Sequence, residues 1–568
     1  MKDEQIINFF SSKYPEINNW LIDAKINNIS FEDYIFNKSL IPIEEFLNFK
    51  ASIYNLPIKV FQVDETIPKD ILNKIPEAVA RNYKILALEL RNNVLYIGVV
   101  DPEVPDLHNK VLEPLKNNLK LEPQLVLISV KDFYLHLEDY SDFENEMKKY
   151  VLDFRSSSGR KLDTDKPLAF QQEVISSEEG PIIRLFELLV RKAVAIRASD
   201  IHLEPLPDKA RIRFRLFGDL KTIAYFPKDV HNPLVNRVKI LTNLRLDETR
   251  VTQDGRFRAV VHGREIDFRV GILPTINGEK VAIRILDPLV GLKKIKDLGL
   301  ADYHIDMMLR NISKTFGMIL VTGPTGSGKT TTLYALIQEI NNDKINIISL
   351  EDPVEYKVFG INQSQIRPEI GYSFAKGLRE ILRQDPDAIL VGEIRDEETA
   401  ELATHAALTG HIVFSTLHTN TAPGAIPRLI DMGVKNYFLP STLNLVIAQR
   451  LVRDLCQNCL VEKSCPKEII SEAEKALQDL PDNLRNFEIK CFDAKGCDKC
   501  HNRGYIGRIG IFEMFEMTKE LSDIILEHKG EGEILEILKK QNFISLRADG
   551  IIKASKGLVS LEEVFKVT

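Results

Sequence analysis

The chain has 568 residues, of which 44% are hydrophobic and 28% charged, and its formal net charge is −7. This length suits about three or four domains, which excludes a single-domain protein. Because the net charge is negative, the chain has no overall positive potential to attract nucleic acid, which is therefore a poor candidate partner. The first ten residues lack the apolar core of a signal peptide, and no window has 18 consecutive apolar residues. We therefore expect a cytoplasmic protein.

The N-terminal quarter mixes helical and strand-like patterns. Residues 31–36 have the spacing of an amphipathic helix, whereas residues 94–100 form an apolar, strand-like run. We expect an α/β accessory domain over residues 1–145. The segment 140–172 is rich in Asp, Glu, Lys and Ser and poor in apolar residues. Such a composition predicts a mobile linker, which we place at residues 146–179.

The next part, residues 180–292, has the patterns of an antiparallel sheet. Arginines alternate with apolar residues over 211–216, as in a strand with one solvated face. Further strand-like runs between residues 257 and 271 are broken once by Gly-Arg, which favours a hairpin. Arg269 and Arg284 belong to this part of the chain. Any role for them at a bound nucleotide therefore requires domain closure or a neighbouring subunit.

From residue 293 to residue 568, apolar strands alternate with amphipathic helices. The apolar runs are 318–322, 345–350, 388–391 and 412–415. This alternation predicts a doubly wound parallel sheet. Polar motifs follow each run directly, so they should meet at the carboxyl edge of the sheet, where open α/β folds bind ligands.

The most informative motif is Gly-Pro-Thr-Gly-Ser-Gly-Lys-Thr at residues 323–330, between a strand-like run and a helix-like segment. Its glycines allow the backbone to turn N–H groups toward phosphate oxygens, and Lys329 can reach the β and γ phosphates. The Thr330 hydroxyl suits Mg²⁺. A flexible turn is the alternative, which the order of strand, loop and helix disfavours. The expected nucleotide-binding residues are Gly323, Pro324, Thr325, Gly326, Ser327, Gly328, Lys329, Thr330 and Thr331.

Carboxylates follow two of the later strands. Glu351 and Asp352 come directly after one run, with Glu355 close behind, so these acidic groups can share one site. Glu393 follows the apolar run 388–391 in the manner of a Walker B element, in which a carboxylate binds Mg²⁺ or orients the attacking water. A single Glu is usually a solvated surface residue, but an acid at the end of an apolar strand in such a sheet favours the functional interpretation.

Histidines and arginines form two further pairs. His411 and His418 stand at the two ends of one strand, and His418 falls where the γ-phosphate edge is expected. Arg379 and Arg383 lie four residues apart, on one face of a helix, and guanidinium groups suit phosphate oxygens. A solvated helix face is the ordinary alternative for such a pair.

All six cysteines lie between residues 456 and 500. In a reducing compartment this clustering favours a metal site over disulfides. Two Cys-x-x-Cys motifs have the pattern of a tetrahedral structural Zn²⁺ site, with a helical excursion near residues 468–478 between them. The expected ligands are Cys456, Cys459, Cys497 and Cys500. Cys465 and Cys491 are left over, either as small core residues or as a substitute ligand.

With these residues in view, the chain resembles the secretion ATPase superfamily, and most of all the type IV pilus assembly ATPases and their type II secretion relatives. The resemblance covers nearly the whole length. Beyond the phosphate loop, the segments that carry it are 198–205, 253–256, 273–275 with Gly278 and Glu279, 351–355, 392–396 and 415–420.

The resemblance implies a PAS-like domain over residues 180–292 and a RecA-like ATPase domain over residues 293–568, with the zinc lobe at about residues 450–510. It implies a ring of six copies that hydrolyses ATP and turns an inner-membrane platform protein. Such a motor is recruited to the inner face of the cytoplasmic membrane through partners. The implied roles are water activation by Glu355, Mg²⁺ and water support by Glu393, a histidine box of His411 and His418, arginine fingers Arg269 and Arg284, and nucleotide contacts by Arg379 and Arg383.

Three classes of function compete at this stage: a motor for pilus assembly or type II secretion, a nucleic-acid translocase, and an adaptor that binds ATP without turnover. The acidic charge opposes the translocase, and the full set of carboxylates opposes the adaptor. Pilus assembly and type II secretion share every motif used here, so residue chemistry leaves both open.

Overall fold

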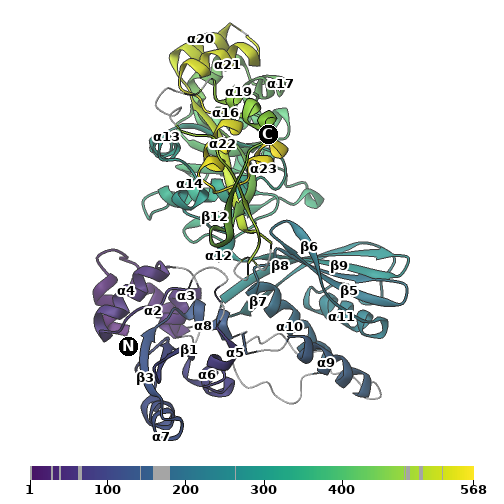
Figure 1. Ribbon diagram of the computed structural model, residues 1–568. Helices are drawn as coiled ribbons and strands as arrows, with labels where there is room; N and C mark the ends of the chain where they lie inside the picture. The colour runs from purple at the N-terminus through teal and green to yellow at the C-terminus, as the bar shows by residue number, and fades with distance from the viewer. Residues whose placement is uncertain are drawn as a thin grey trace. The chain divides into compact units, whose positions relative to one another are not determined.

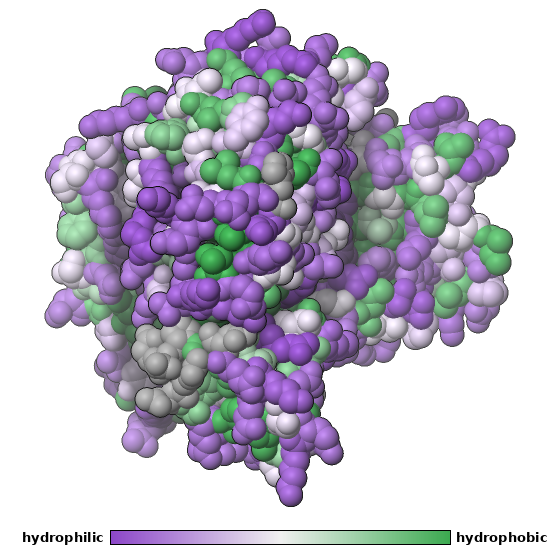
Figure 2. Space-filling view, turned by 90° about the horizontal axis from the view of Figure 1, so that it is seen from above, coloured by the Kyte–Doolittle hydropathy of each residue, from purple (hydrophilic) through white to green (hydrophobic). Residues whose placement is uncertain are grey.

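The computed structural model describes residues 3–157 and 180–568, apart from 27–29, 38–39, 62–64, 66, 138, 141–142, 263, 479, 481–486, 498–499, 501–502 and 528. The chain folds into two compact units, residues 1–287 and 288–568 (Figure 1). None of the helices in the described part has the length and apolar composition that crossing a bilayer requires. Figure 2 shows a face that is mostly hydrophilic, with small scattered hydrophobic patches.

The N-terminal region is α/β, as expected. Four helices share a small core that includes Phe10, Trp20 and Phe31. They are α1 (Asp3–Phe10), α2 (Ile17–Ile26), α3 (Phe31–Asn37) and α4 (Ile43–Tyr54). A three-stranded sheet follows, in which β2 pairs antiparallel with β1 and parallel with β3. Its elements are β1 (Ile85–Arg91), β2 (Val94–Val99) and β3 (Glu122–Leu127), with helices α5 (Lys69–Leu72), α6 (Glu77–Tyr83), α7 (Glu113–Leu119) and α8 (Val130–Leu137).

The first part of the predicted linker is instead a helix, α9 (Phe143–Ser157). Its apolar residues, spaced three or four apart, pack into the core that α10 (Pro181–Ala195) also enters. The prediction of a mobile linker was wrong for this helix. It rested on the overall polar composition of the segment and overlooked the apolar residues that recur every three or four positions. Residues 158–179, the rest of that linker, lie outside the described residues. The domain limits at residues 145, 179 and 292 stay predictions.

The remainder of the first unit is the expected antiparallel domain. Its six strands are ordered β6-β5-β4-β9-β8-β7. They are β4 (Asp200–Pro205), β5 (Lys209–Leu216), β6 (Asp219–Pro227), β7 (Gln253–Val261), β8 (Arg264–Thr275) and β9 (Gly278–Leu286). Helices α10 and α11 (Lys228–Leu241) pack against this sheet (Figure 1). Burial alternates along β5, so its arginines lie on the face away from the core.

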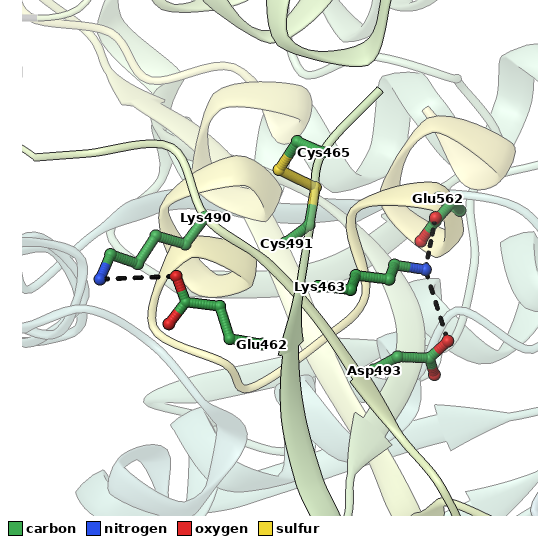
Figure 3. Close-up of a disulfide and its surroundings, with 7 residues drawn as sticks. All are labelled: Glu462, Lys463, Cys465, Lys490, Cys491, Asp493 and Glu562. Atoms are coloured by element: carbon green, nitrogen blue, oxygen red, sulfur yellow. Dashed lines mark hydrogen bonds and ion pairs between the residues drawn. A yellow bond between two sulfur atoms is a disulfide. The ribbon is translucent and has the colours of Figure 1, made fainter. Parts of the chain in front are cut away.

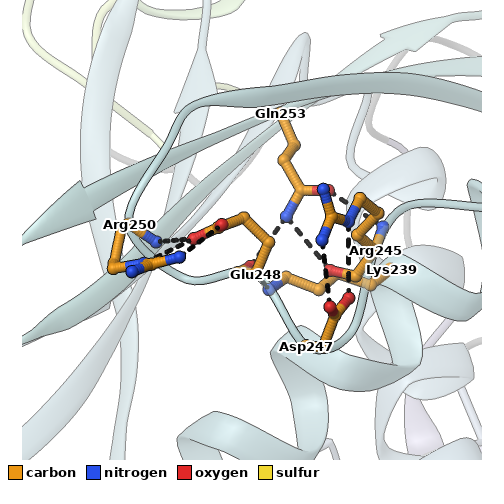
Figure 4. A network of polar contacts seen from close by, with 6 residues as sticks. All are labelled: Lys239, Arg245, Asp247, Glu248, Arg250 and Gln253. Carbon is orange, nitrogen blue, oxygen red and sulfur yellow. Dashed lines mark hydrogen bonds and ion pairs between the residues drawn. The ribbon is translucent and has the colours of Figure 1, made fainter.

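A polar network holds the loop between α11 and β7 in one conformation (Figure 4). The fully buried Lys239 donates to the carbonyl of Glu248 at 2.8 Å. The amide of Gln253 donates to the carbonyls of Arg245 and Glu248 and accepts from the N–H of Arg245. Because these groups satisfy otherwise unpaired backbone atoms, the loop is structurally defined where β7 begins.

The second unit is built on a seven-stranded sheet of order β12-β11-β13-β14-β10-β15-β18, in which only β18 pairs antiparallel. The strands are β10 (Gly317–Thr322), β11 (Ile347–Glu351), β12 (Ile361–Gln365), β13 (Ala388–Val391), β14 (Ile412–Leu417), β15 (Leu443–Leu455) and β18 (Tyr505–Glu516). Successive residues of β10 enter different hydrophobic clusters, so both faces of the sheet are covered. This confirms the doubly wound, RecA-like parallel sheet.

Helices cover the two faces of this sheet, and a small lobe extends from its C-terminal strands. One cluster receives α13 (Asp302–Ile312) and α14 (Lys329–Ile340). The other receives α15 (Phe374–Ile381), α16 (Glu397–Leu408), α17 (Ala425–Asp431), α20 (Lys519–Leu526), α21 (Glu531–Lys540), α22 (Leu546–Ser555) and α23 (Leu561–Val567). The lobe contains β16 (Leu460–Lys463), α19 (Lys467–Leu477) and β17 (Cys491–Ala494), which confirms the helical excursion between the Cys-x-x-Cys motifs.

Candidate functional site

The phosphate loop joins the fully buried strand β10 to the start of α14. Gly323, Gly326 and Gly328 have φ values of +145°, +80° and +91°, which side chains of L-residues rarely allow. At Gly323 a Cβ atom would also lie 2.6 Å from the carbonyl of Gln449. Pro324, Thr325 and Gly326 are exposed. The loop is therefore open to solvent at its tip and sits at a helix N-terminus, where partial positive charge favours an anion.

Lys329 lies against this loop. Its Nζ donates to the carbonyls of Gly323 at 2.8 Å and Pro324 at 3.2 Å. Burial lowers the pKa of Lys329, while the nearby Glu393 carboxylate acts in the opposite direction. The Nζ group of Lys329 is therefore held beside the loop that would receive a phosphate. Thr330 and Thr331, half-buried in the first turn of α14, complete the set expected from the sequence.

The Walker B carboxylate Glu393 lies two residues beyond β13 and contacts an arginine and a histidine. Arg395 Nη2 lies 2.5 Å from one carboxylate oxygen of Glu393, and His418 Nε2 lies 3.3 Å from the other. Arg395 is also 3.9 Å from Asp352, and its pairing with Glu393 raises the pKa of Arg395. Sequence reasoning assigned no role to Arg395, although it stands in the Gly-Glu-Ile-Arg-Asp run. It joins the Walker B and acidic segments.

The two histidines do not lie together. His418 follows β14 at the carboxyl edge, beside Glu393. His411 precedes β14 at the opposite edge, where its Nδ1 lies 3.0 Å from the carbonyl of Ala406. The six residues of β14 lie between them, so their Cα atoms are seven steps of about 3.3 Å apart, or about 23 Å. The structure therefore does not bring His411 to the phosphate loop of its own unit, because the two ends of a strand face opposite edges of the sheet.

The acidic segment after β11 divides into a buried and an accessible part. Glu351 is buried and accepts hydrogen bonds from Tyr334 Oη, Ser349 Oγ at 2.5 Å and Gln363 Nε2 at 3.1 Å. Burial raises the pKa of Glu351. Glu351 thus ties α14 to β11 and β12, and it is structural. The half-buried Glu355 remains the candidate for contact with water.

The predicted arginine pair of α15 is only partly helical. Arg379 lies on α15 and donates to Glu398 of α16. Arg383 lies beyond the helix, which ends at Ile381, and is 3.7 Å from Glu380. The single helix face expected for the two arginines was therefore wrong. Contact with nucleotide stays a prediction for both.

In the first unit, Arg269 and Arg284 are directly opposite each other on β8 and β9. The same register places Arg256 of β7 opposite Arg269 and Asp200 of β4 opposite Arg284. Asp200 lies 3.2 Å from Arg284 and 3.3 Å from Arg215. Arg256, Arg269 and Arg284 therefore form a row across neighbouring strands, with Asp200 next to Arg284. Such a row attracts anions.

The four predicted zinc ligands do converge. The Sγ atoms of Cys456, Cys459, Cys497 and Cys500 all lie within 4.8 Å of one another, and three of the pairs are 3.8 Å apart. A tetrahedron of thiolates around Zn²⁺ with Zn–S bonds of about 2.3 Å has edges of about 3.8 Å. The cluster therefore has the size of a four-thiolate zinc site.

The two remaining cysteines form a disulfide, Cys465–Cys491, which corrects the expectation that disulfides are absent (Figure 3). Cys491 is buried at the start of β17, and Cys465 follows β16. Nearby, Lys463 contacts Asp493 and Glu562. The expectation failed because it rested on compartment alone, whereas the pairing of β16 with β17 sets which thiols meet. Neither cysteine is a substitute metal ligand here.

The chain is similar to known proteins along most of its length. Residues 176–566 match the family described as Type II/IV secretion system protein, and residues 54–145 match the MshEN domain. The Type II secretion system ATPase E of Vibrio cholerae is 40% identical over 499 residues, which are 88% of this chain and 97% of that protein. The Type IV pilus assembly ATPase PilB of Acinetobacter baylyi is 38% identical over 502 residues, 87% and 84% of the two chains. The X-ray structure of the Legionella pneumophila ATPase DotB has a TM-score of 0.50 at 22% identity, over 72% of this chain and 98% of that one, which supports the fold.

The Tyr334–Glu351 contact generates a stability prediction. Tyr334→Phe should lower the free energy of unfolding by about 1–3 kcal/mol, because the buried carboxylate loses a donor. Thermal and urea denaturation measure this loss. Tyr372→Phe is the control, since its hydroxyl bonds to Ser364 in a half-buried position. A loss no larger than that of the control would contradict the structural role of Glu351.

Proposed function

Since the chain belongs to the type II/IV secretion system protein family and is an ATPase, we propose that it works as a homohexameric motor that powers type IV pilus assembly. In this proposal it acts at the inner face of the cytoplasmic membrane through a platform protein. The observation that carries the proposal is the meeting of the phosphate loop, Glu393 and His418 at one edge of the sheet. Type IV pilus assembly ATPases among its relatives support the choice of pilus assembly as the process that it powers.

The proposed reaction is attack of water on the γ-phosphorus of ATP. The bond from that phosphorus to the β–γ bridging oxygen breaks as the new P–O bond forms, and Glu355 accepts the proton of the water. Lys329 and the loop N–H groups hold the phosphates. Thr330 and Glu393 are oxygen ligands of the kind that Mg²⁺ prefers, and the ion would neutralise charge on the transferring group.

Arginines complete the site in this proposal. Arg269 and Arg284 belong to the first unit, so domain closure or a neighbouring subunit must bring them to the γ-phosphate. Guanidinium groups delivered in this way stabilise charge that develops in the transition state. Support comes from their place in a row of arginines, in which Arg284 is exposed and Arg269 is half-buried. Hydrolysis that depends on such closure converts ATP turnover into movement.

We further propose that the four-cysteine cluster binds one structural Zn²⁺. All four coordination positions would be filled by thiolates, which leaves none for catalysis. The ion would fix the lobe that extends from β15 and β18.

Type II secretion is the second candidate, because a type II secretion ATPase matches the chain as well as the pilus ATPases do. Deletion of the gene in its own organism separates the two. Loss of surface pili with normal release of secreted enzymes supports pilus assembly. The reverse phenotype would transfer the proposal to secretion. Strong, salt-sensitive binding of DNA would instead favour a nucleic-acid translocase.

Two substitutions test the division of roles at the phosphate loop. Glu355→Gln should retain ATP binding but lower turnover by roughly a hundredfold or more, because the amide keeps the shape and cannot accept the proton. Lys329→Ala should instead weaken nucleotide binding itself. Nucleotide affinity and phosphate release measure both effects. An active Glu355→Gln enzyme would reject Glu355 as the general base.

The zinc proposal predicts one ion per chain by elemental analysis. Cys456→Ser or Cys500→Ser should lose the ion, since three thiolates leave an incomplete coordination shell. Cys465→Ser is the matched control, because it removes a thiol of the same lobe from the disulfide. Equal zinc content in all of these proteins would refute the assignment.

The arginine proposal predicts that Arg269→Ala and Arg284→Ala lower turnover by roughly a hundredfold or more while ATP affinity changes little. Arg258→Ala is the control, because Arg258 lies two residues from Arg256 on β7 and is engaged by Asp267 at 2.9 Å. Steady-state kinetics and nucleotide titration separate the effects. Turnover near the control value in both variants would remove the first unit from the reaction.

A further inference from the structure

Gln449 is a buried amide of β15 that contacts the phosphate loop from the side. Its side chain is 2% exposed. Gln449 Nε2 donates to the carbonyl of Ser327 at 2.6 Å, and Gln449 Oε1 accepts from the hydroxyl of Thr332 at 2.6 Å. The orientation of this amide is unambiguous, because a carbonyl oxygen can only accept and therefore requires the Nε2 group. One side chain thus joins the loop to the first turns of α14.

The bond to Ser327 determines which way a loop N–H group points. A trans peptide is planar, and its C=O and N–H bonds point in opposite directions. Gln449 holds the Ser327 carbonyl toward β15, so the N–H of Gly328, in the same peptide unit, points away from β15. In a phosphate loop, successive backbone N–H groups meet phosphate oxygens, so the direction of the Gly328 N–H matters for binding.

The fit around Gln449 is close on both sides of the loop. A Cβ atom at Gly328 would lie 2.8 Å from Gln449 Nε2, and one at Gly323 would lie 2.6 Å from the Gln449 carbonyl. The next residue, Arg450, donates to the carbonyl of Asn420 at 3.0 Å, in the segment that follows β14. Strand β15 therefore forms a wall along the loop, and the buried amide of Gln449 is its polar contact with the Ser327–Gly328 peptide.

We propose that Gln449 is a positioning residue for nucleotide binding, which keeps the Ser327–Gly328 peptide in the orientation that presents the Gly328 N–H to a phosphate group. Gln449 touches no phosphate itself and acts through the loop. The proposal rests on the nucleotide-binding function proposed above, and it assigns to β15 a role that the loop motif does not reveal. Without Gln449, the Ser327 carbonyl loses its partner and the peptide can rotate.

The test uses the full chain with ADP and a non-hydrolysable ATP analogue, titrated by calorimetry. Gln449→Leu should weaken binding of both nucleotides by about tenfold to a hundredfold, because two buried hydrogen-bonding groups lose their partner. KM for ATP should rise in parallel. Thr332→Ser keeps the hydroxyl and should bind as the unmodified chain does. Thr332→Val should weaken binding. In the double variant Gln449→Leu/Thr332→Val, the fold-loss of affinity should be smaller than the product of the two single losses, because the two residues share one hydrogen bond.

Gln541→Leu is the matched control, since this amide bonds to Thr518 and Glu520 away from the phosphate loop. The melting temperature of each variant is measured alongside its titration. The proposal requires that Gln449→Leu lose nucleotide affinity and that Gln541→Leu keep it when both variants lose a similar amount of thermal stability. Unchanged affinity in Gln449→Leu would overturn it. If Gln449→Leu does not fold, Thr332→Val decides, and unchanged affinity there overturns it equally. A chain that binds nucleotide without hydrolysing it would refute the proposed motor yet leave this test intact.

Discussion

The phosphate loop must hold its backbone N–H groups in place even when no anion binds them. Three positive φ values at Gly323, Gly326 and Gly328 set its shape. Its surroundings keep that shape: Lys329 contacts its carbonyls, and Gln449 holds the Ser327 carbonyl. Because the loop is preorganised, little of the binding free energy is lost in ordering it when an anion binds. Strands β14 and β15 lie on either side of β10. His418 follows β14, Gln449 lies on β15, and Glu393 follows β13, the next strand along.

Burial separates the carboxylates of the second unit into different tasks. Glu351 lies inside the fold, receives several hydrogen bonds and links the loop helix to the sheet. Glu393 is engaged by Arg395 and His418, which fixes its direction beside the loop. Glu355 is less buried than Glu351 and remains accessible to a water molecule. The three carboxylates therefore have different roles because their environments differ: Glu351 is structural, Glu393 is ion-paired and Glu355 is the candidate base.

The antiparallel sheet of the first unit carries a row of arginines. Like charges directly opposite on neighbouring strands repel, and the row of Arg256, Arg269 and Arg284 has one carboxylate, Asp200, at its end. In the proposed mechanism, this row would add its positive charge to that of the phosphate loop when both meet the triphosphate.

The sequence by itself determined the parallel sheet, the antiparallel sheet, the phosphate loop and the four-cysteine cluster. Each depends on local spacing: strand–loop–helix order around Lys329, two-residue alternation over 211–216, and paired Cys-x-x-Cys motifs. Only the tertiary structure decided what depends on which strands lie side by side. It paired Cys465 with Cys491, buried Glu351 and brought Gln449 to a loop more than a hundred residues earlier in the chain. Spacing along a chain specifies periodicity and local turns, whereas strand order and burial arise from contacts between distant segments, which no local pattern records.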